Sequence, residues 1–167
     1  GAGGVVTCRL TLAAPLEDGL YFTSFTATNG AGLTSTASSD GAVLDESAPE
    51  VIAARLPTFR PTIRLPNGAS QQGGYPVRVS SADIVVPLSV FDDVHSGVES
   101  IQCTVAWDSG SLPAGTTAPT YAPAVVTADA NGLFNLVIQN QTVYNGARLT
   151  AVAIATNGRG LRSDPLQ

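Results

Sequence analysis

The stretch ATNGAGL at residues 27–33 returns as ATNGRGL at residues 155–161, a shift of 128 positions. An Asn-Gly pair supplies residues that tolerate positive φ, and the glycine two positions later allows a bulged, longer loop. Each copy therefore predicts the tip of a β-hairpin. The spacing of these glycines does not match a Gly-rich nucleotide loop, and no helical pattern follows them.

The residues ahead of the two tips align without a gap. LYFTSFT at 20–26 falls opposite RLTAVAI at 148–154, and both predict buried strands. Further short, β-branched runs are separated by Gly, Pro, Asp or Asn, and they lie at 33–45, 51–54, 84–90, 100–107, 124–128 and 133–138. This spacing predicts an all-β sandwich without a long helix. Pro87 inside one run predicts an edge position or a bulge.

The segment ESAP at 46–49 breaks the pattern and predicts an extended joint. We expect residues 1–47 to be the closing strands of one repeat and residues 48–167 to be a second repeat. The second copy ends seven residues after Gly160, so it lacks most of its return strand. We expect the sequence to be part of a longer chain, with the missing strand supplied by adjoining chain or a neighbouring subunit.

Composition excludes several classes of protein. Charged residues make up 13% of the chain and hydrophobic ones 44%, which predicts a folded protein. The 13 acidic residues exceed the 8 basic ones, which are arginines scattered without a run, so nucleic acid is not expected as a partner. No stretch approaches the roughly 20 apolar residues of a membrane-spanning helix, so we expect no membrane insertion in this segment.

Three short pieces resemble the tandem immunoglobulin-like and fibronectin-III-like repeats of large secreted and cell-surface proteins. FDDVHSGV at 91–98 is similar to the "D…SGV" turn between the family's second and third strands. Residues 27–33 resemble the hairpin near a repeat's end, and LDESAP at 44–49 resembles the "VDTTPP" joint between repeats. The Asn-Gly-Ala-Gly-Leu version, with high Ala and no Lys, most resembles repeats of algal ciliary-surface glycoproteins of the mastigoneme type.

The resemblance implies an immunoglobulin-like β-sandwich and a non-catalytic structural role in an extracellular or cell-surface protein, here of the ciliary surface. Such repeats build a rod, array or filament, and the implied partners are neighbouring repeats or subunits, and glycans. An adhesion or carbohydrate-binding module and an accessory domain of a secreted enzyme are the alternatives. Exposed aromatic clusters would favour the first alternative, and a catalytic constellation in flanking chain the second.

Few residues could carry chemistry, and we predict no catalytic residue, metal site or cofactor. His95 is the only histidine, which predicts a solvated turn residue rather than part of a triad or zinc site. Asp92, Asp93 and Glu99 could offer oxygen ligands to calcium, but a hydrogen-bonded turn is the favoured interpretation. Trp107 shares the face of Ile101, Cys103 and Val105, which favours core packing over a sugar-stacking platform.

Cys8 and Cys103 are the only cysteines, and in a secreted protein both should be oxidised. A Cys8–Cys103 bridge between repeats, bonds to cysteines outside this sequence, and two buried thiols all remain open. Asn140-Gln141-Thr142 fits the N-glycosylation acceptor and lies in a predicted polar link between strands. We predict a glycan on Asn140.

Overall fold

The computed structural model describes residues 7, 9, 11, 14–65, 70–71, 78–144 and 146–167. The chain divides into two compact units, Gly1–Asp45 and Glu46–Gln167. The described residues form antiparallel strands and two short 3-10 helices, at Ala53–Thr58 and Ser109–Ser111. The all-β prediction is confirmed.

The first unit consists of two strand pairs. β1 (Gly19–Tyr21) pairs with β4 (Ala42–Leu44), and β2 (Ser24–Thr28) pairs with β3 (Thr34–Ser38) through the predicted hairpin tip. Hydroxyls meet across the hairpin, with 2.7 Å between the Oγ atoms of Ser24 and Ser38. Among the described residues of this unit no apolar side chain is buried.

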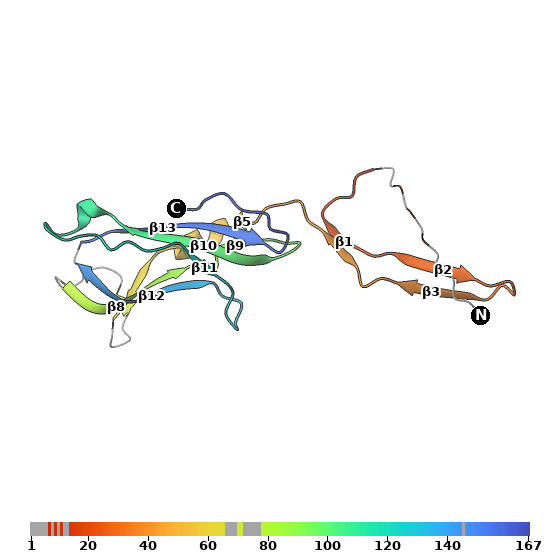
Figure 1. Ribbon diagram of the computed structural model, residues 1–167, viewed down its shortest axis with the longest axis horizontal. Helices are drawn as coiled ribbons and strands as arrows, with labels where there is room; N and C mark the ends of the chain where they lie inside the picture. Colours follow the sequence, from red (N-terminus) through yellow and green to blue (C-terminus); the bar gives the residue numbers. More distant parts are fainter. Residues whose placement is uncertain are drawn as a thin grey trace. The chain divides into compact units, whose positions relative to one another are not determined.

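The second unit has two main sheets, drawn as two layers in Figure 1. One has the order β12-β8-β6-β7 and the other β11-β10-β13, while β5 and β9 form a separate pair. Bounds of the strands are β5 Glu50–Val51, β6 Thr62–Arg64, β7 Ser70–Gln71, β8 Arg78–Pro87, β9 Phe91–Asp92, β10 Val98–Trp107, β11 Ala124–Val126, β12 Asn135–Tyr144 and β13 Leu149–Asn157.

One hydrophobic core lies between these sheets. Alternate residues of β8, β10 and β13 are buried because successive side chains of a strand point to opposite faces. Their buried side chains include Ala82, Ile84, Val86, Ile101, Cys103, Val105, Trp107, Ala151, Ala153 and Ala155. Trp107 belongs to this core, as predicted.

Two strand predictions need correction. β8 is flanked by β12 and β6, so Pro87 does not lie on an edge strand. Proline is tolerated because it is the last residue of β8, and the pairing with β6 has already ended at Val85. The predicted strand 51–54 ends at Val51, after which the chain enters the 3-10 helix that contains Pro57.

The end of the chain returns along β13. Arg162 bridges Thr156, and Leu166 bridges Ala153 with two backbone hydrogen bonds of 2.9 Å. Ser163 adds a bond from its backbone N–H to the Ala155 carbonyl. The edge of β13 that we expected an outside strand to cover is therefore covered here by the chain itself.

Candidate functional site

Three described turns share one hydrogen-bonding scheme, in which residue 1 is Asn or Asp, residue 4 is Gly and residue 5 is Leu. They start at Asn29, Asp129 and Asn157. In each, the backbone N–H of residue 1 donates to the carbonyl of residue 5, and its carbonyl accepts from the N–H of residue 4. Its side-chain oxygen accepts from the N–H groups of residues 3 and 5 at 2.8–3.0 Å. Glycine occupies position 4 because φ there is between 75° and 83°.

The turn at Asn157 differs from the others because its side chain is fully buried, with 0% exposed. Its amide nitrogen Nδ2 donates to the carbonyl of Ser47 at 2.9 Å and to Oδ2 of Asp93 at 3.0 Å. One side chain thus holds its own turn, the joint residue Ser47 and the turn after β9. The second copy of the hairpin motif thus meets residues of two pieces that resemble repeat motifs, Asp93 of the turn and Ser47 of the joint.

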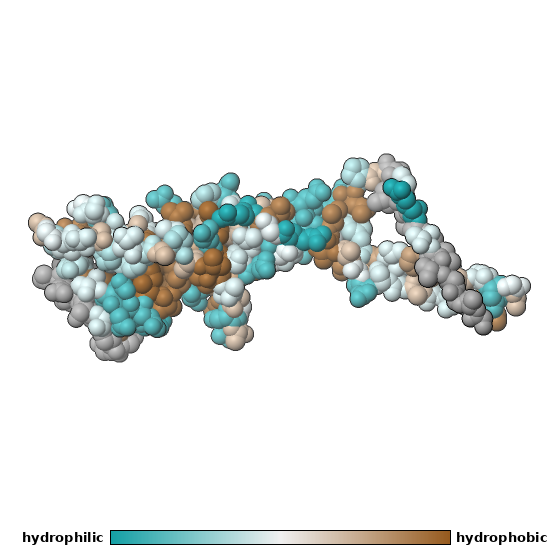
Figure 2. Space-filling view, viewed as in Figure 1, coloured by the Kyte–Doolittle hydropathy of each residue, from teal (hydrophilic) through white to brown (hydrophobic). Residues whose placement is uncertain are grey.

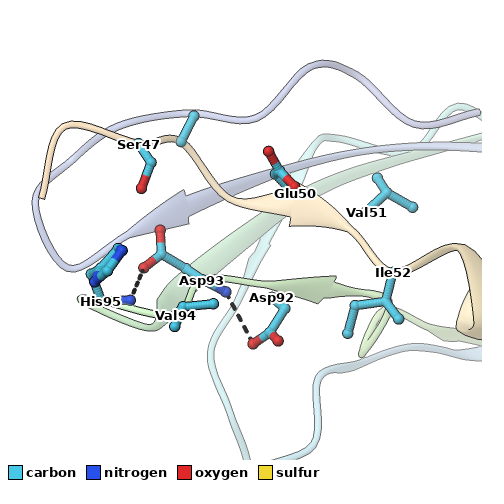
Figure 3. Close-up of a pocket in the computed structure, with 9 residues that line it drawn as sticks. Ser47, Glu50, Val51, Ile52, Asp92, Asp93, Val94 and His95 are labelled. Atoms are coloured by element: carbon cyan, nitrogen blue, oxygen red, sulfur yellow. Dashed lines mark hydrogen bonds between the residues drawn. The ribbon is translucent and has the colours of Figure 1, made fainter. Parts of the chain in front are cut away.

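Asp93 organises the turn between β9 and β10. Its Oδ1 accepts from the backbone N–H groups of His95, Ser96 and Gly97 at 3.1, 2.8 and 3.1 Å. Because Oδ2 accepts from Asn157, both carboxylate oxygens bind protein donors. Figure 3 shows the bond from His95, and the one that the Asp93 N–H donates to the Asp92 carboxylate.

Backbone also meets backbone at this position. The N–H of Gly158 donates to the Gly97 carbonyl at 3.1 Å, and a Cβ on Gly158 would lie 2.9 Å from the Ser96 carbonyl oxygen. A side chain there would displace the turn after β9. We call the contacts of Ser47, Asp93, Ser96, Asn157 and Gly158 the joint cluster.

A cleft of about 400 Å³ lies beside the joint cluster (Figure 3). It is lined by Ser47, Ala48, Glu50, Val51, Ile52, Asp92, Asp93, Val94 and His95. Glu50 and Asp92 are opposite each other in the β5–β9 pair, which gives this surface negative charge. His95 lies in the turn and is exposed, as predicted.

The calcium hypothesis gains no support from the geometry. Asp93 uses both oxygens within the protein, and Asp92 accepts the Asp93 N–H. Glu99 is an exposed residue of β10. Among the residues that the structure describes, no group of three His, Cys, Asp or Glu side chains could hold a metal ion. For Asp92 and Asp93 the hydrogen bonds bear out the turn interpretation, whereas Glu99 belongs to a strand.

Trp107 and Cys103 face the core from β10. Nε1 of Trp107 donates to the Tyr121 hydroxyl at 2.9 Å, and that hydroxyl donates to Oε1 of Gln141 at 2.9 Å. Cys103 is a free thiol with 1% exposed, and burial raises its pKa to about 11. Cys8 lies outside the described residues, so a bridge between the two cysteines stays a prediction without structural support.

Asn140 is exposed, but its predicted setting was wrong. It does not lie in a link between strands, because β12 continues through it to Tyr144. The pairing of β12 with β8 is irregular between Ile138 and Gln141, and Asn140 takes a positive φ of 57° there. Its side chain therefore projects from a bulge. Glycosylation of this residue stays a prediction.

Comparison with protein-family models, curated proteins and solved structures found no match to this chain. Within the described part of the chain, no helix is long and apolar enough to cross a membrane. The described residues thus form an all-β protein with two related hairpins and a hydrogen-bonded cluster at Ser47, Asp93 and Asn157.

Sequence reasoning missed two features of this site. The third turn, at Asp129, could have been found from the spacing of Asp129, Gly132 and Leu133, which repeats that of Asn29, Gly32 and Leu33. The role of Asn157 had no local signal, since Asn29 sits in a seven-residue stretch that differs only at Ala31, and its turn is exposed.

Proposed function

We propose that this chain is a non-catalytic structural segment of a large extracellular or cell-surface glycoprotein, in which immunoglobulin-like units follow one another through short joints. The joint cluster is the observation that carries the proposal. The side-chain amide of Asn157 donates to the carbonyl of the joint residue Ser47, 110 positions away, and to the carboxylate of the turn residue Asp93. All three residues belong to the second unit, so the contact fixes the first residues after the boundary between the units to the hairpin turn and to the turn after β9.

The internal repeat supports the same function. Thr28 pairs with Thr34 next to the first tip, and Thr156 bridges Arg162 next to the second, which are the same positions shifted by 128. Two hairpins of one type on either side of a joint are what a tandem array contains. The immunoglobulin-like assignment rests on the three motifs and on the core between two antiparallel sheets.

The chemistry of the site also favours a structural role. The oxygens of Asp93 and the side chain of Asn157 bind backbone and side-chain groups of the protein itself. The buried position of Trp107 removes it as a platform for stacking on sugars. The ciliary surface, the neighbouring repeats and the glycans come from the resemblance alone.

The size of the natural protein tests the proposal. Reduced, denatured protein from its source would be separated by electrophoresis and detected with an antibody against residues 46–167. We expect a species many times larger than the 17.0 kDa of this sequence. A band near that mass would contradict the tandem array.

The extracellular location is tested through Asn140. Expression through the secretory route should add a glycan that an N-glycosidase removes, because the residue is exposed on the folded protein. The variant Asn140→Gln should run at the deglycosylated mass. Unmodified Asn140 in the natural protein would count against a secreted glycoprotein.

A further inference from the structure

β2 presents an edge without a described partner, although its counterpart in the second unit has one. In the repeat with its shift of 128 positions, β2 corresponds to residues of β13, and β3 corresponds to the returning residues 162–166. On its other edge β13 pairs with β10 from Val98↔Asn157 to Trp107↔Leu149. Among the described residues, β2 pairs with β3 alone.

The face of β2 that corresponds to the core face of β13 is also uncovered. Phe25 and Ala27 stand at the positions of Ala153 and Ala155. Ala153 is 0% exposed and Phe25 is 52% exposed. In Figure 2 the surface over β1 is hydrophobic and that over the β2–β3 hairpin is pale, neither strongly polar nor strongly apolar.

The edge of β2 carries none of the features that keep strands apart. Residues 19–39 contain no charged residue and no proline, and the β2–β3 register runs without a bulge. Natural sheets protect free edges with charges, prolines or bulges, because an unprotected edge pairs with other strands. A neutral, regular edge next to an exposed phenylalanine indicates a surface that another strand covers.

We propose that β2 binds, antiparallel, an extended segment of the β10 type donated by another unit of the same kind. The donor has apolar side chains at alternate positions, and the one that faces Phe25 is small. The size limit follows from the second unit, where Cys103 stands opposite Ala153. Since phenylalanine fills much more space than alanine, a close-packed interface needs a smaller partner. The inference rests on the proposed function and names the partner of one strand.

The test uses the whole 167-residue chain, isotopically labelled, and a synthetic peptide of residues 98–107 with Cys103→Ala. We expect chemical-shift changes centred on β2 and at least tenfold slower hydrogen exchange of its amides at saturating peptide. A control peptide with Thr104→Pro in addition should not bind, because proline removes an N–H and disturbs the extended pairing.

Two variants of the chain locate the contact. Phe25→Asp should weaken peptide binding at least tenfold, because it places a charge on the covered face. Leu33→Asp, at an exposed position of the turn, should leave binding unchanged. Spectra of both free variants would verify that the β2–β3 hairpin is retained.

Three results would overturn the inference. These are no shift on β2 up to the solubility of the peptide, equal binding of the proline peptide, and a dimer of this chain in which a segment other than β10 covers β2. A large natural protein combined with any of them would leave the proposed array standing and refute the strand docking alone. A small natural protein with tight peptide binding would do the reverse.

Discussion

The Asn157 side chain joins three segments of the second unit. Its side-chain hydrogen bonds reach its own turn, Ser47 and Asp93, from a residue with no exposed surface. A buried group that loses its partners costs about 1–3 kcal/mol, and more if a charge is left behind. Loss of the Asn157 amide would remove the hydrogen bond that it donates to Oδ2 of Asp93.

We therefore expect Asn157→Ala to lower the free energy of unfolding of the second unit by about 2–4 kcal/mol. Urea titration followed by Trp107 fluorescence would measure it, because the only tryptophan lies in that unit's core. The matched control is Asp129→Ala, which removes the same two turn bonds at an exposed position and should cost about 1 kcal/mol. Equal losses in the two variants would refute a special role for Asn157.

Position 158 requires glycine because a Cβ would be too close to the Ser96 carbonyl, and not because the backbone has a positive φ there. Ala130 occupies the same second position in the turn at Asp129, so the turn itself accepts a Cβ. In Gly158→Ala the new Cβ would meet the Ser96 carbonyl at 2.9 Å, and we expect a loss of about 1–3 kcal/mol in the same titration. The exchange Ala130→Gly should change stability by less than about 1 kcal/mol. An unchanged midpoint of urea unfolding for Gly158→Ala would show that the turn at Asn157 and the turn after β9 are not held together.

At the scale of elements, the returning segment 162–166 acts as a strand despite its length. It exchanges two hydrogen bonds with Ala153 and one with the Ala155 carbonyl, and the Ser163 hydroxyl accepts the Ala155 N–H. Leu166 packs against the core. The segment closes an edge that would otherwise expose the backbone of β13.

Deletion of residues 162–167 should therefore destabilise the second unit by about 2–4 kcal/mol, from lost hydrogen bonds and the lost burial of Leu166. The midpoint of urea unfolding, again from Trp107, is the measurement. Deletion of Gln167 alone is the control and should have no effect, since that residue is exposed. If both truncations behave alike, the segment contributes nothing to the sheet.

At the scale of the whole molecule, the two units differ in what holds them. The second unit encloses a core of buried residues from Ile63 to Ala155. The described part of the first unit buries no apolar side chain, and its strands are held by backbone pairing and cross-strand hydroxyls. Two-stranded ribbons of this kind are marginally stable in water.

Amide hydrogen exchange of the free chain should reflect this difference. We expect amides of β10 and β13 to be protected by factors of at least about 10³, and those of β2 and β3 by less than about 10. Mass spectrometry or NMR after dilution into D₂O resolves the two units. Equal protection would mean that the first unit is covered in solution, for example by a second copy.

Local sequence patterns predicted the hairpin turns and the two long strands of one sheet. Asn or Asp at position 1 and Gly at position 4 of a turn satisfy backbone donors and permit positive φ within five residues, so both hairpin tips were predictable. Alternating apolar residues likewise predicted β10 and β13 and the buried place of Trp107, because strand faces alternate with period two.

Which of the similar turns is buried and bonded to other segments depends on contacts between residues far apart in the chain. Asn29 and Asn157 share six residues of a seven-residue stretch, themselves included, yet of the two only Asn157 meets Ser47 and Asp93, because both partners are distant in sequence. The place of Pro87 inside the sheet likewise depends on where β6 ends its pairing with β8, and the bulge at Asn140 depends on the irregular pairing of β12 with β8. Contacts between residues far apart in the chain leave no local pattern, and these contacts set the joint cluster.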